Sequence, residues 1–241
     1  MAPEEGTEVN ERVWGRVGAL SGLVFVVLSL LGAFLYPEQP RSDSPAAVTA
    51  AWVHNHRVAL QAGMIISLFA AGALVWFVGY LRTRIGDERD RAVKVGATVL
   101  SGGIAVAIMS ALAVMPTAIL AFMDAQPGGI HDAVLVRMLG DLNTVFFSAV
   151  SVMSVVFLAA LGAAMLDRQL PAPWLGWLSL VFGVVNGVAV WVEITFSSYH
   201  GKVWNTIGWG AYIGFLAVIL LSSLTTMGGR LETRARSLAV S

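Results

Sequence analysis

Four polar residues recur every seven positions along one apolar stretch in the last third of the chain: Ser179, Asn186, Glu193 and His200. On an ideal helix a seven-residue step drifts by only about 20°, so these side chains share one face. Glu193 directly follows the apolar run, and a carboxylate in that position usually faces a bundle interior, a cavity or a partner rather than lipid. The pattern therefore predicts a polar stripe that could bind a ligand or, through Glu193, donate a proton to one.

Two further polar faces could meet this stripe. His54, Arg57 and Gln61 share a face by their three- and four-residue spacing. Arg57 is the candidate partner of Glu193, and a third polar row starts at Asp141. We therefore expect three helices to converge on an outward-opening polar pocket lined by Arg57, Gln61, Asp141, Asn186, Glu193 and His200. The alternative is that the small polar residues serve only helix packing, and that an Arg57–Glu193 pair only fixes the order of the helices.

The chain has no cysteine, and its histidines do not form a metal-binding pattern. His54 and His56 lie two positions apart, about 200° around a helix, so their imidazoles cannot grip one ion together. No carboxylate stands three or four positions from any of the histidines. The sequence also contains no phosphate loop, nucleophile elbow or zinc-protease motif. We therefore expect no metal site and no cofactor.

Aromatic residues and glycines lie close to these polar faces. Five aromatic residues could wall an apolar ligand site, although a membrane-interface belt is the simpler explanation for Trp52, Trp191, Phe196, Tyr199 and Trp204. Glycines inside apolar helices allow close approach of neighbouring helices. The sequence therefore predicts close helix contacts at Gly102, Gly103, Gly176, Gly183 and Gly187.

Six apolar segments must position all of these residues. Of 241 residues, 57% are hydrophobic and only 12% are charged, whereas a typical soluble domain has about 25% charged residues. A bilayer core of about 30 Å needs roughly 20 apolar residues in a helix, and runs of that length exclude alternating barrel strands. The predicted spans are 17–36, 58–81, 95–123, 144–166, 174–192 and 206–227, with tails at 1–16 and 228–241. The fold class is therefore all-α, a single polytopic bundle of six transmembrane helices.

Two segments before these spans are also predicted to be helical. Ser44-Pro45 reads as an N-cap followed by a proline at the first helical position, so a helix should run from there into the second span. Gly128-Gly129 breaks the chain before 130–142, whose apolar spacing is helical and which leads into the fourth span. Pro116 should kink the third span. The helical extensions would form a cap on the extracytoplasmic side.

Basic residues set the expected orientation. Most of the 15 Lys and Arg residues, and the short loop Arg82 to Lys94 in particular, fall on the inner side if the N-terminus is cytoplasmic. We expect a multi-pass protein of the cytoplasmic membrane with both termini in the cytoplasm. The 15 basic residues balance 15 acidic ones, which gives no sign of a nucleic-acid partner. Membrane lipids are the expected neighbours, and nothing in the sequence specifies an oligomeric state.

Several segments resemble those of a large group of six-helix integral membrane proteins, abundant in actinomycetes and classed as a domain of unknown function. The likeness lies in the first span with the Ser-Asp-Ser-Pro-Ala-Ala segment 42–47, in the second-span ending Phe-Val-Gly-Tyr-Leu-Arg at 77–82, and in Leu-Pro-Ala-Pro-Trp-Leu-Gly-Trp at 170–177. It implies the six-helix fold and a location in the cytoplasmic membrane. It implies no activity, and Glu193 and His200 match no motif of that family.

Three functions are compatible with these patterns. The first is binding or movement of a small amphiphile or lipid through the polar pocket. The second is an accessory or scaffold protein whose cap contacts another envelope component and which needs no ligand. The third is a membrane-embedded enzyme, similar to terpenoid cyclases or isomerases, in which Glu193 protonates a lipophilic substrate. We favour them in that order, so an enzymatic role is the least favoured.

Overall fold

Within the residues it describes, the computed structural model consists of six α-helices and contains no strand. These residues are 5–37, 39–40, 44–85, 90–127, 129–130, 132–170, 172–195 and 202–240, and side chains are described for all of them except 5–14, 90–91, 193–195, 202–206 and 228–240. The helices are α1 (Glu5–Leu35), α2 (Ala46–Arg84), α3 (Asp90–Asp124), α4 (Ala133–Leu166), α5 (Pro173–Thr195) and α6 (Lys202–Val240). The all-α prediction is therefore confirmed.

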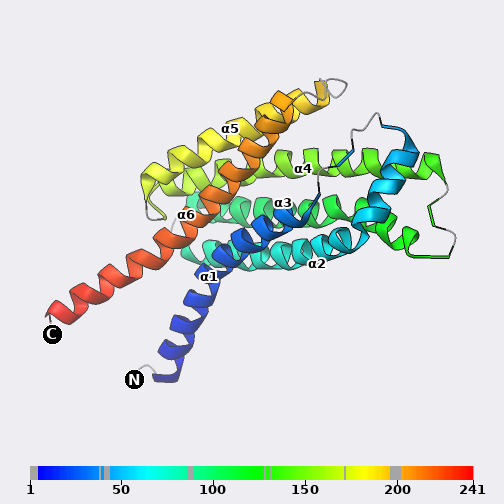
Figure 1. Ribbon diagram of the computed structural model, residues 1–241. Helices are drawn as coiled ribbons and strands as arrows, with labels where there is room; N and C mark the ends of the chain where they lie inside the picture. The colour runs from blue at the N-terminus through cyan, green and yellow to red at the C-terminus, as the bar shows by residue number, and fades with distance from the viewer. Residues whose placement is uncertain are drawn as a thin grey trace.

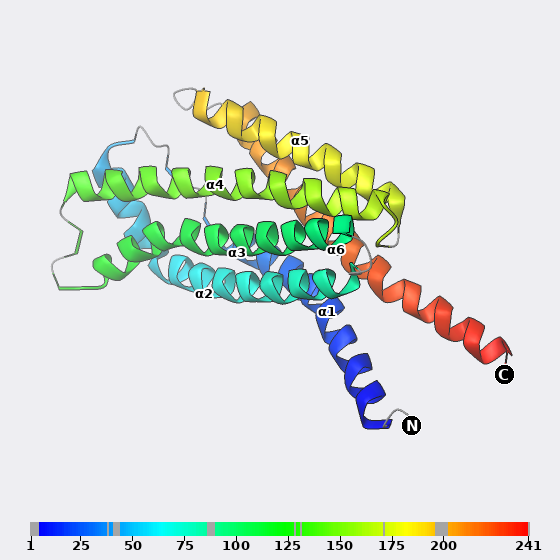
Figure 2. The same ribbon diagram turned by 180° about the vertical axis from the view of Figure 1, so that it is seen from behind.

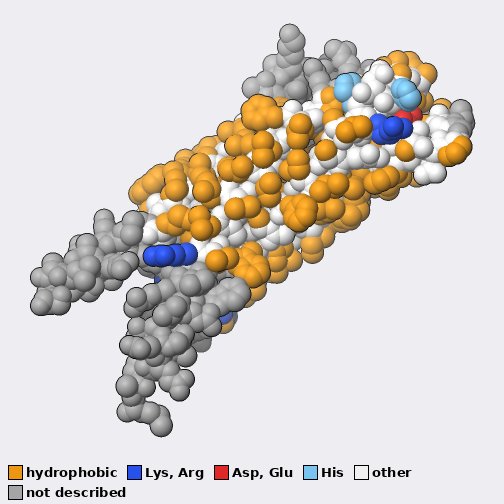
Figure 3. Space-filling model, turned by 60° about the horizontal axis from the view of Figure 1, so that its bottom comes forward, with side chains coloured by type: hydrophobic (Ala, Val, Ile, Leu, Met, Phe, Trp, Pro, Cys, Tyr) orange, Lys and Arg blue, Asp and Glu red, His pale blue; other side chains and the backbone are white. Residues whose placement is uncertain are grey.

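Each helix contains a stretch that is long and apolar enough to cross a membrane. These stretches are Gly15–Leu35, Ala46–Arg84, Ala92–Asp124, Ala133–Leu166, Pro173–Val192 and Ile207–Met227. Hydrophobic side chains cover the long side of the molecule seen in Figure 3, and its charged and histidine side chains gather toward the two ends. This distribution matches the six predicted spans and supports a multi-pass membrane protein.

The helices α2 and α4 begin before the predicted spans, as the sequence indicated. The N-cap of α2 is Pro45, one residue later than predicted. The helix α4 starts only after Asp132, whose carboxylate accepts hydrogen bonds from the backbone N–H groups of Val134 and Leu135 at 2.8 and 3.2 Å. At a rise of about 1.5 Å per residue, the 39 residues of α2 extend over roughly 58 Å, nearly twice the bilayer core of about 30 Å.

Neighbouring helices in the sequence are neighbours in space. The pairs α1–α2, α2–α3, α3–α4 and α4–α5 pack together, and α6 returns against α1 and α5 (Figures 1 and 2). Both chain termini lie at one end of the bundle, together with the last turns of α2 and α4. We call this the termini end. The opposite end, which contains Tyr36, Trp52, Asp124 and Val136, is called the cap end.

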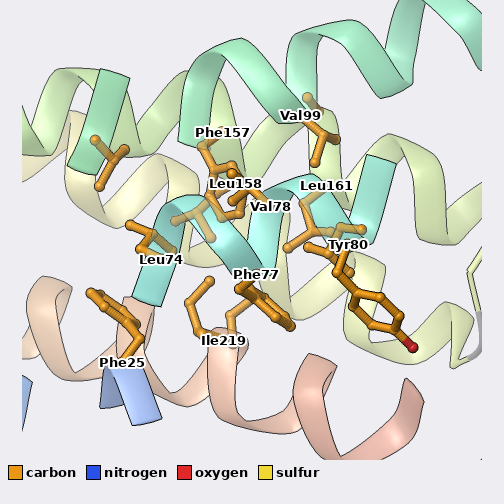
Figure 4. Close-up of a cluster of buried hydrophobic side chains, with 14 of the residues drawn as sticks. Phe25, Leu74, Phe77, Val78, Tyr80, Val99, Phe157, Leu158, Leu161 and Ile219 are labelled. Atoms are coloured by element: carbon orange, nitrogen blue, oxygen red, sulfur yellow. The ribbon is translucent and has the colours of Figure 1, made fainter. Parts of the chain in front are cut away.

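Two hydrophobic cores hold the helices together. The larger one joins all six helices, and its centre includes the fully buried Phe77 and Phe157 (Figure 4). The ring of Phe215 meets Phe25 and Phe157 at centroid distances of 6.1 and 6.0 Å. The smaller core joins α2, α3 and α4 at the cap end and consists of Val53, Leu60, Leu120, Ala121, Val136 and Leu139.

Close helix contacts occur at two of the predicted glycines of α3. A Cβ atom at Gly102 would lie 3.1 Å from the Cα of Phe157, and one at Gly103 would lie 2.9 Å from the Cβ of Val78. Neither neighbour can give way easily, because both belong to the packed core. The predicted close contacts are therefore confirmed at these two positions.

Candidate functional site

An ion cluster joins α2 to α3 at the cap end. His54 Nδ1 lies 3.2 Å from both carboxylate oxygens of Asp124, and an Arg57 guanidinium nitrogen lies 3.8 Å from one of them. The Asp124 side chain is only 9% exposed, against 71% for His54 and 41% for Arg57. Asp124 ends α3, where the helix dipole disfavours a negative charge, so Arg57, and His54 when protonated, compensate it. The described partner of Arg57 is thus Asp124, since the side chain of Glu193 lies outside the described residues.

Asp124 was not among the residues predicted from the sequence, although a signal for it was present. It directly follows the third predicted span, 95–123, just as Glu193 directly follows the fifth. Both are acidic residues at the end of an apolar run, and such carboxylates need a partner. The rule that singled out Glu193 therefore applies equally to Asp124.

The other predicted residues of α2 and α4 are not gathered into one pocket wall. Gln61 is half-buried one turn beyond Arg57, whereas Asp141 of α4 is exposed. Near that α4 row, Asn143 is only 3% exposed and donates through its amide to the carbonyl of Ala113 at 2.6 Å. Asn143 therefore joins α4 to α3, which is a packing role.

Pro116 lies inside α3, which continues past it without interruption. Proline supplies no backbone N–H, so the carbonyl of Leu112, four residues earlier, loses its helical partner, and side-chain hydroxyl and amide groups bond to the two carbonyls that follow it. The hydroxyl of Thr117 donates to the carbonyl of Val114 at 3.1 Å, next to the carbonyl that Asn143 binds. The Tyr36 hydroxyl at the end of α1 donates in turn to Thr117 Oγ1 at 2.6 Å. This network links α1, α3 and α4 near the cap end.

The polar stripe of α5 is divided between two neighbouring helices. The Ser179 hydroxyl donates to the carbonyl of Leu158 in α4 at 2.8 Å. The Asn186 amide donates to the carbonyl of Phe182 at 2.8 Å and to that of Ala211 in α6 at 3.4 Å. Both side chains are buried and act in helix packing. The side chain of Glu193 and the whole of His200 lie outside the described residues.

The two histidines of α2 have different partners, as their two-residue spacing predicted. His54 meets Asp124, whereas the His56 ring packs against Trp52 in a tilted arrangement, with 5.7 Å between the ring centroids. Trp52 packs on Tyr36 as well, at 6.3 Å, and its buried Nε1 has no hydrogen-bond partner among the described residues. Across that part of the chain, no three His, Asp or Glu side chains lie close enough together to hold a metal ion.

A groove of about 610 Å³ opens between α4 and α5. Its lining is apolar throughout and consists of Val155, Ala159, Leu180, Gly183, Val184, Gly187, Val188 and Trp191. The prediction of close helix contacts is met only as ordinary van der Waals contact at Gly183 and Gly187, where a Cβ would lie 3.6 and 3.7 Å from its nearest atom of α4. It was right for Gly176, where a Cβ would lie 2.9 Å from the carbonyl oxygen of Gly162. Beyond that crossing α4 and α5 diverge, and the groove lies between them.

No protein-family model matches the chain, and neither a curated protein nor a solved structure matches it. The resemblance to the actinomycete six-helix family therefore stays a prediction. A function must be argued from the geometry of the chain itself.

Proposed function

We propose that this protein binds the hydrocarbon chain of an amphiphile or lipid in the groove between α4 and α5, with the polar headgroup toward the cap end. The groove is the observation that carries the proposal, because it combines a volume of about 610 Å³ with apolar walls on two helices able to cross a membrane. Small-molecule sites typically enclose about 300–1,000 Å³. A polar solute would find no hydrogen-bonding side chain on most of these walls, so the ligand is lipophilic.

The headgroup contacts that we propose lie at and beyond Trp191. This tryptophan is the lining residue of α5 nearest the cap end, and tryptophan favours the level of lipid headgroups. Glu193 and His200, which follow it in the sequence, and Asp141 of α4 stay predictions as polar contacts, and the side chain of Glu193 and the whole of His200 lie outside the described residues. Arg57 is occupied by Asp124 and Asn186 by α6, so we do not assign them to the ligand.

We further propose that the protein lies in the cytoplasmic membrane with both termini in the cytoplasm. The concentration of basic residues in the loop Arg82 to Lys94 supports this orientation. The cap end, with the ion cluster and the smaller core, then faces the extracytoplasmic side. In this arrangement the ligand headgroup lies at the extracytoplasmic surface of the membrane.

Native mass spectrometry of the purified protein tests the proposed binding. Gly187→Leu places a large side chain in the groove and is expected to remove one phospholipid that the unsubstituted protein retains when its detergent is stripped. Gly72→Leu is the matched control, because Gly72 is an exposed glycine of α2 where a Cβ would meet nothing within 4 Å. Equal lipid retention by the two variants would contradict the proposal.

A further inference from the structure

The groove is closed at one end, and this decides which lipid can enter it. We infer that it holds a single acyl chain of a phospholipid from the leaflet at the cap end and excludes lipids of the opposite leaflet. This inference rests on the proposed function and adds the class of ligand, the leaflet and the direction of entry. It follows from the floor of the groove, its widening and its length.

The floor of the groove is the crossing of α4 and α5 at Gly162 and Gly176. A Cβ on either glycine would lie 2.9 Å from the carbonyl oxygen of the other, so the two backbones are nearly in contact. Ser179 is fully buried and donates a hydrogen bond across the same crossing to the carbonyl of Leu158 at 2.8 Å. No hydrocarbon chain fits between helices at this distance, so a chain cannot pass from the groove toward the termini end.

Above the floor the two helices pack less tightly. The nearest neighbour of a Cβ recedes to 3.6 Å at Gly183 and 3.7 Å at Gly187. Figures 1 and 2 both show α4 and α5 close together at the termini end and apart toward the cap end. The groove is therefore V-shaped and opens toward the cap end and sideways to the bilayer.

The length of the groove matches one leaflet. Leu180 and Trp191 mark its two ends on α5, and the helical rise of about 1.5 Å per residue puts them roughly 16 Å apart. The hydrocarbon core of a bilayer is about 30 Å thick, so one leaflet contributes about half of it. A chain that begins at the headgroup level beside Trp191 would end at the floor.

Hydrocarbon is the only solvent available at this depth. Val184 and Val188 on the groove's edge are 67% and 48% exposed, and both lie within the stretch of α5 that can cross a membrane. A polar occupant would lose its hydration without gaining a hydrogen-bonding partner, which is unfavourable. An acyl chain loses nothing by entering and fills a void that would otherwise weaken packing.

Spin-labelled lipids test the leaflet directly. Phosphatidylcholine with a nitroxide on its acyl chain is reconstituted with the full-length protein. Ascorbate, which does not cross the bilayer, then reduces the nitroxide label in the exposed leaflet. The chain has no cysteine, so Ser241→Cys with an impermeant maleimide reports which end of the protein is exposed. The measured quantity is the nitroxide signal from motionally restricted lipid. We compare its decrease in the Gly187→Leu protein with that in the Gly72→Leu protein.

We expect the loss of about one restricted lipid per chain, confined to the label in the cap-end leaflet. Val184→Phe, which enlarges an exposed lining residue without entering the packed core, should reproduce it. Loss of signal from the termini-end leaflet, or equally from both, would overturn the leaflet inference while leaving lipid binding intact. An unchanged restricted signal together with unchanged lipid retention in native mass spectrometry would overturn the proposed function as well.

Discussion

Replacing Gly162 with alanine is expected to separate α4 from α5 at the floor of the groove. The new methyl group would lie 2.9 Å from the carbonyl oxygen of Gly176 and 2.9 Å from Cγ of Leu180. The leucine can change rotamer, but the carbonyl belongs to the backbone of α5. Relief therefore requires the whole helix to move by a few tenths of an ångström.

The expected loss of stability follows from two opposing effects. Overpacking a well-filled interior costs about 1–3 kcal/mol, whereas glycine to alanine inside a helix gains about 1 kcal/mol. Gly72→Ala carries the helix gain alone, because its Cβ would meet nothing within 4 Å. The free energy of unfolding should therefore be about 1–3 kcal/mol lower for Gly162→Ala than for Gly72→Ala.

Reversible unfolding in mixed detergent micelles, followed by tryptophan fluorescence, measures this difference. Gly176→Ala should show a similar loss, because its methyl group would lie 2.9 Å from the Gly162 carbonyl oxygen. The loss of stability in the double variant should be smaller than the sum of the losses in the two single variants, because the first substitution already opens the same crossing. Equal stabilities for Gly162→Ala and Gly72→Ala, or strict additivity in the double variant, would refute the close crossing.

Three further substitutions test other parts of the structure by the same unfolding measurement. Asn143→Ala should lower the free energy of unfolding by about 1–2 kcal/mol, because it removes the buried hydrogen bond between α4 and α3. Asp141 is exposed, so a loss for Asn143→Ala as small as that for Asp141→Ala would contradict the packing role of Asn143. Asp124→Asn should change the free energy of unfolding by less than about 1 kcal/mol, because His54 is exposed and Arg57 is half-exposed, so solvent screens both basic partners. A loss above roughly 2 kcal/mol would be inconsistent with this. Arg168→Gly should leave the free energy of unfolding unchanged or raise it by up to about 1 kcal/mol, because Arg168 has a φ of 57°, which glycine adopts without strain. Gln169→Gly should lower the free energy of unfolding. A larger loss for Arg168→Gly than for Gln169→Gly would contradict this account.

Hydropathy was sufficient to predict the helical elements. Spanning segments in lipid must satisfy their own backbone hydrogen bonds, so six long apolar runs leave few alternatives to six helices. Helix starts were less precise. The predicted start at Ile130 gave way to a start after Asp132, because the Asp132 carboxylate caps the free N–H groups of Val134 and Leu135, the second and third residues of the helix.

The candidate site was harder to predict, because periodicity shows which residues share a face but not which helix packs against it. Ser179 and Asn186 lie on one predicted stripe, yet they bond to α4 and α6 respectively. Gly176 and Gly183 likewise have the same sequence signal, although one lies at a near-contact of backbones and the other lines an open groove. The angle between α4 and α5 makes this difference, and it depends on the whole bundle.

The most direct test of the central claim is a crystal structure of the protein grown in a lipidic mesophase. We predict one continuous chain of lipid density between α4 and α5, starting beside Trp191 and ending above the Gly162–Gly176 crossing, with its headgroup toward the cap end. An empty groove, or one filled by a helix of a second protein copy, would contradict lipid binding.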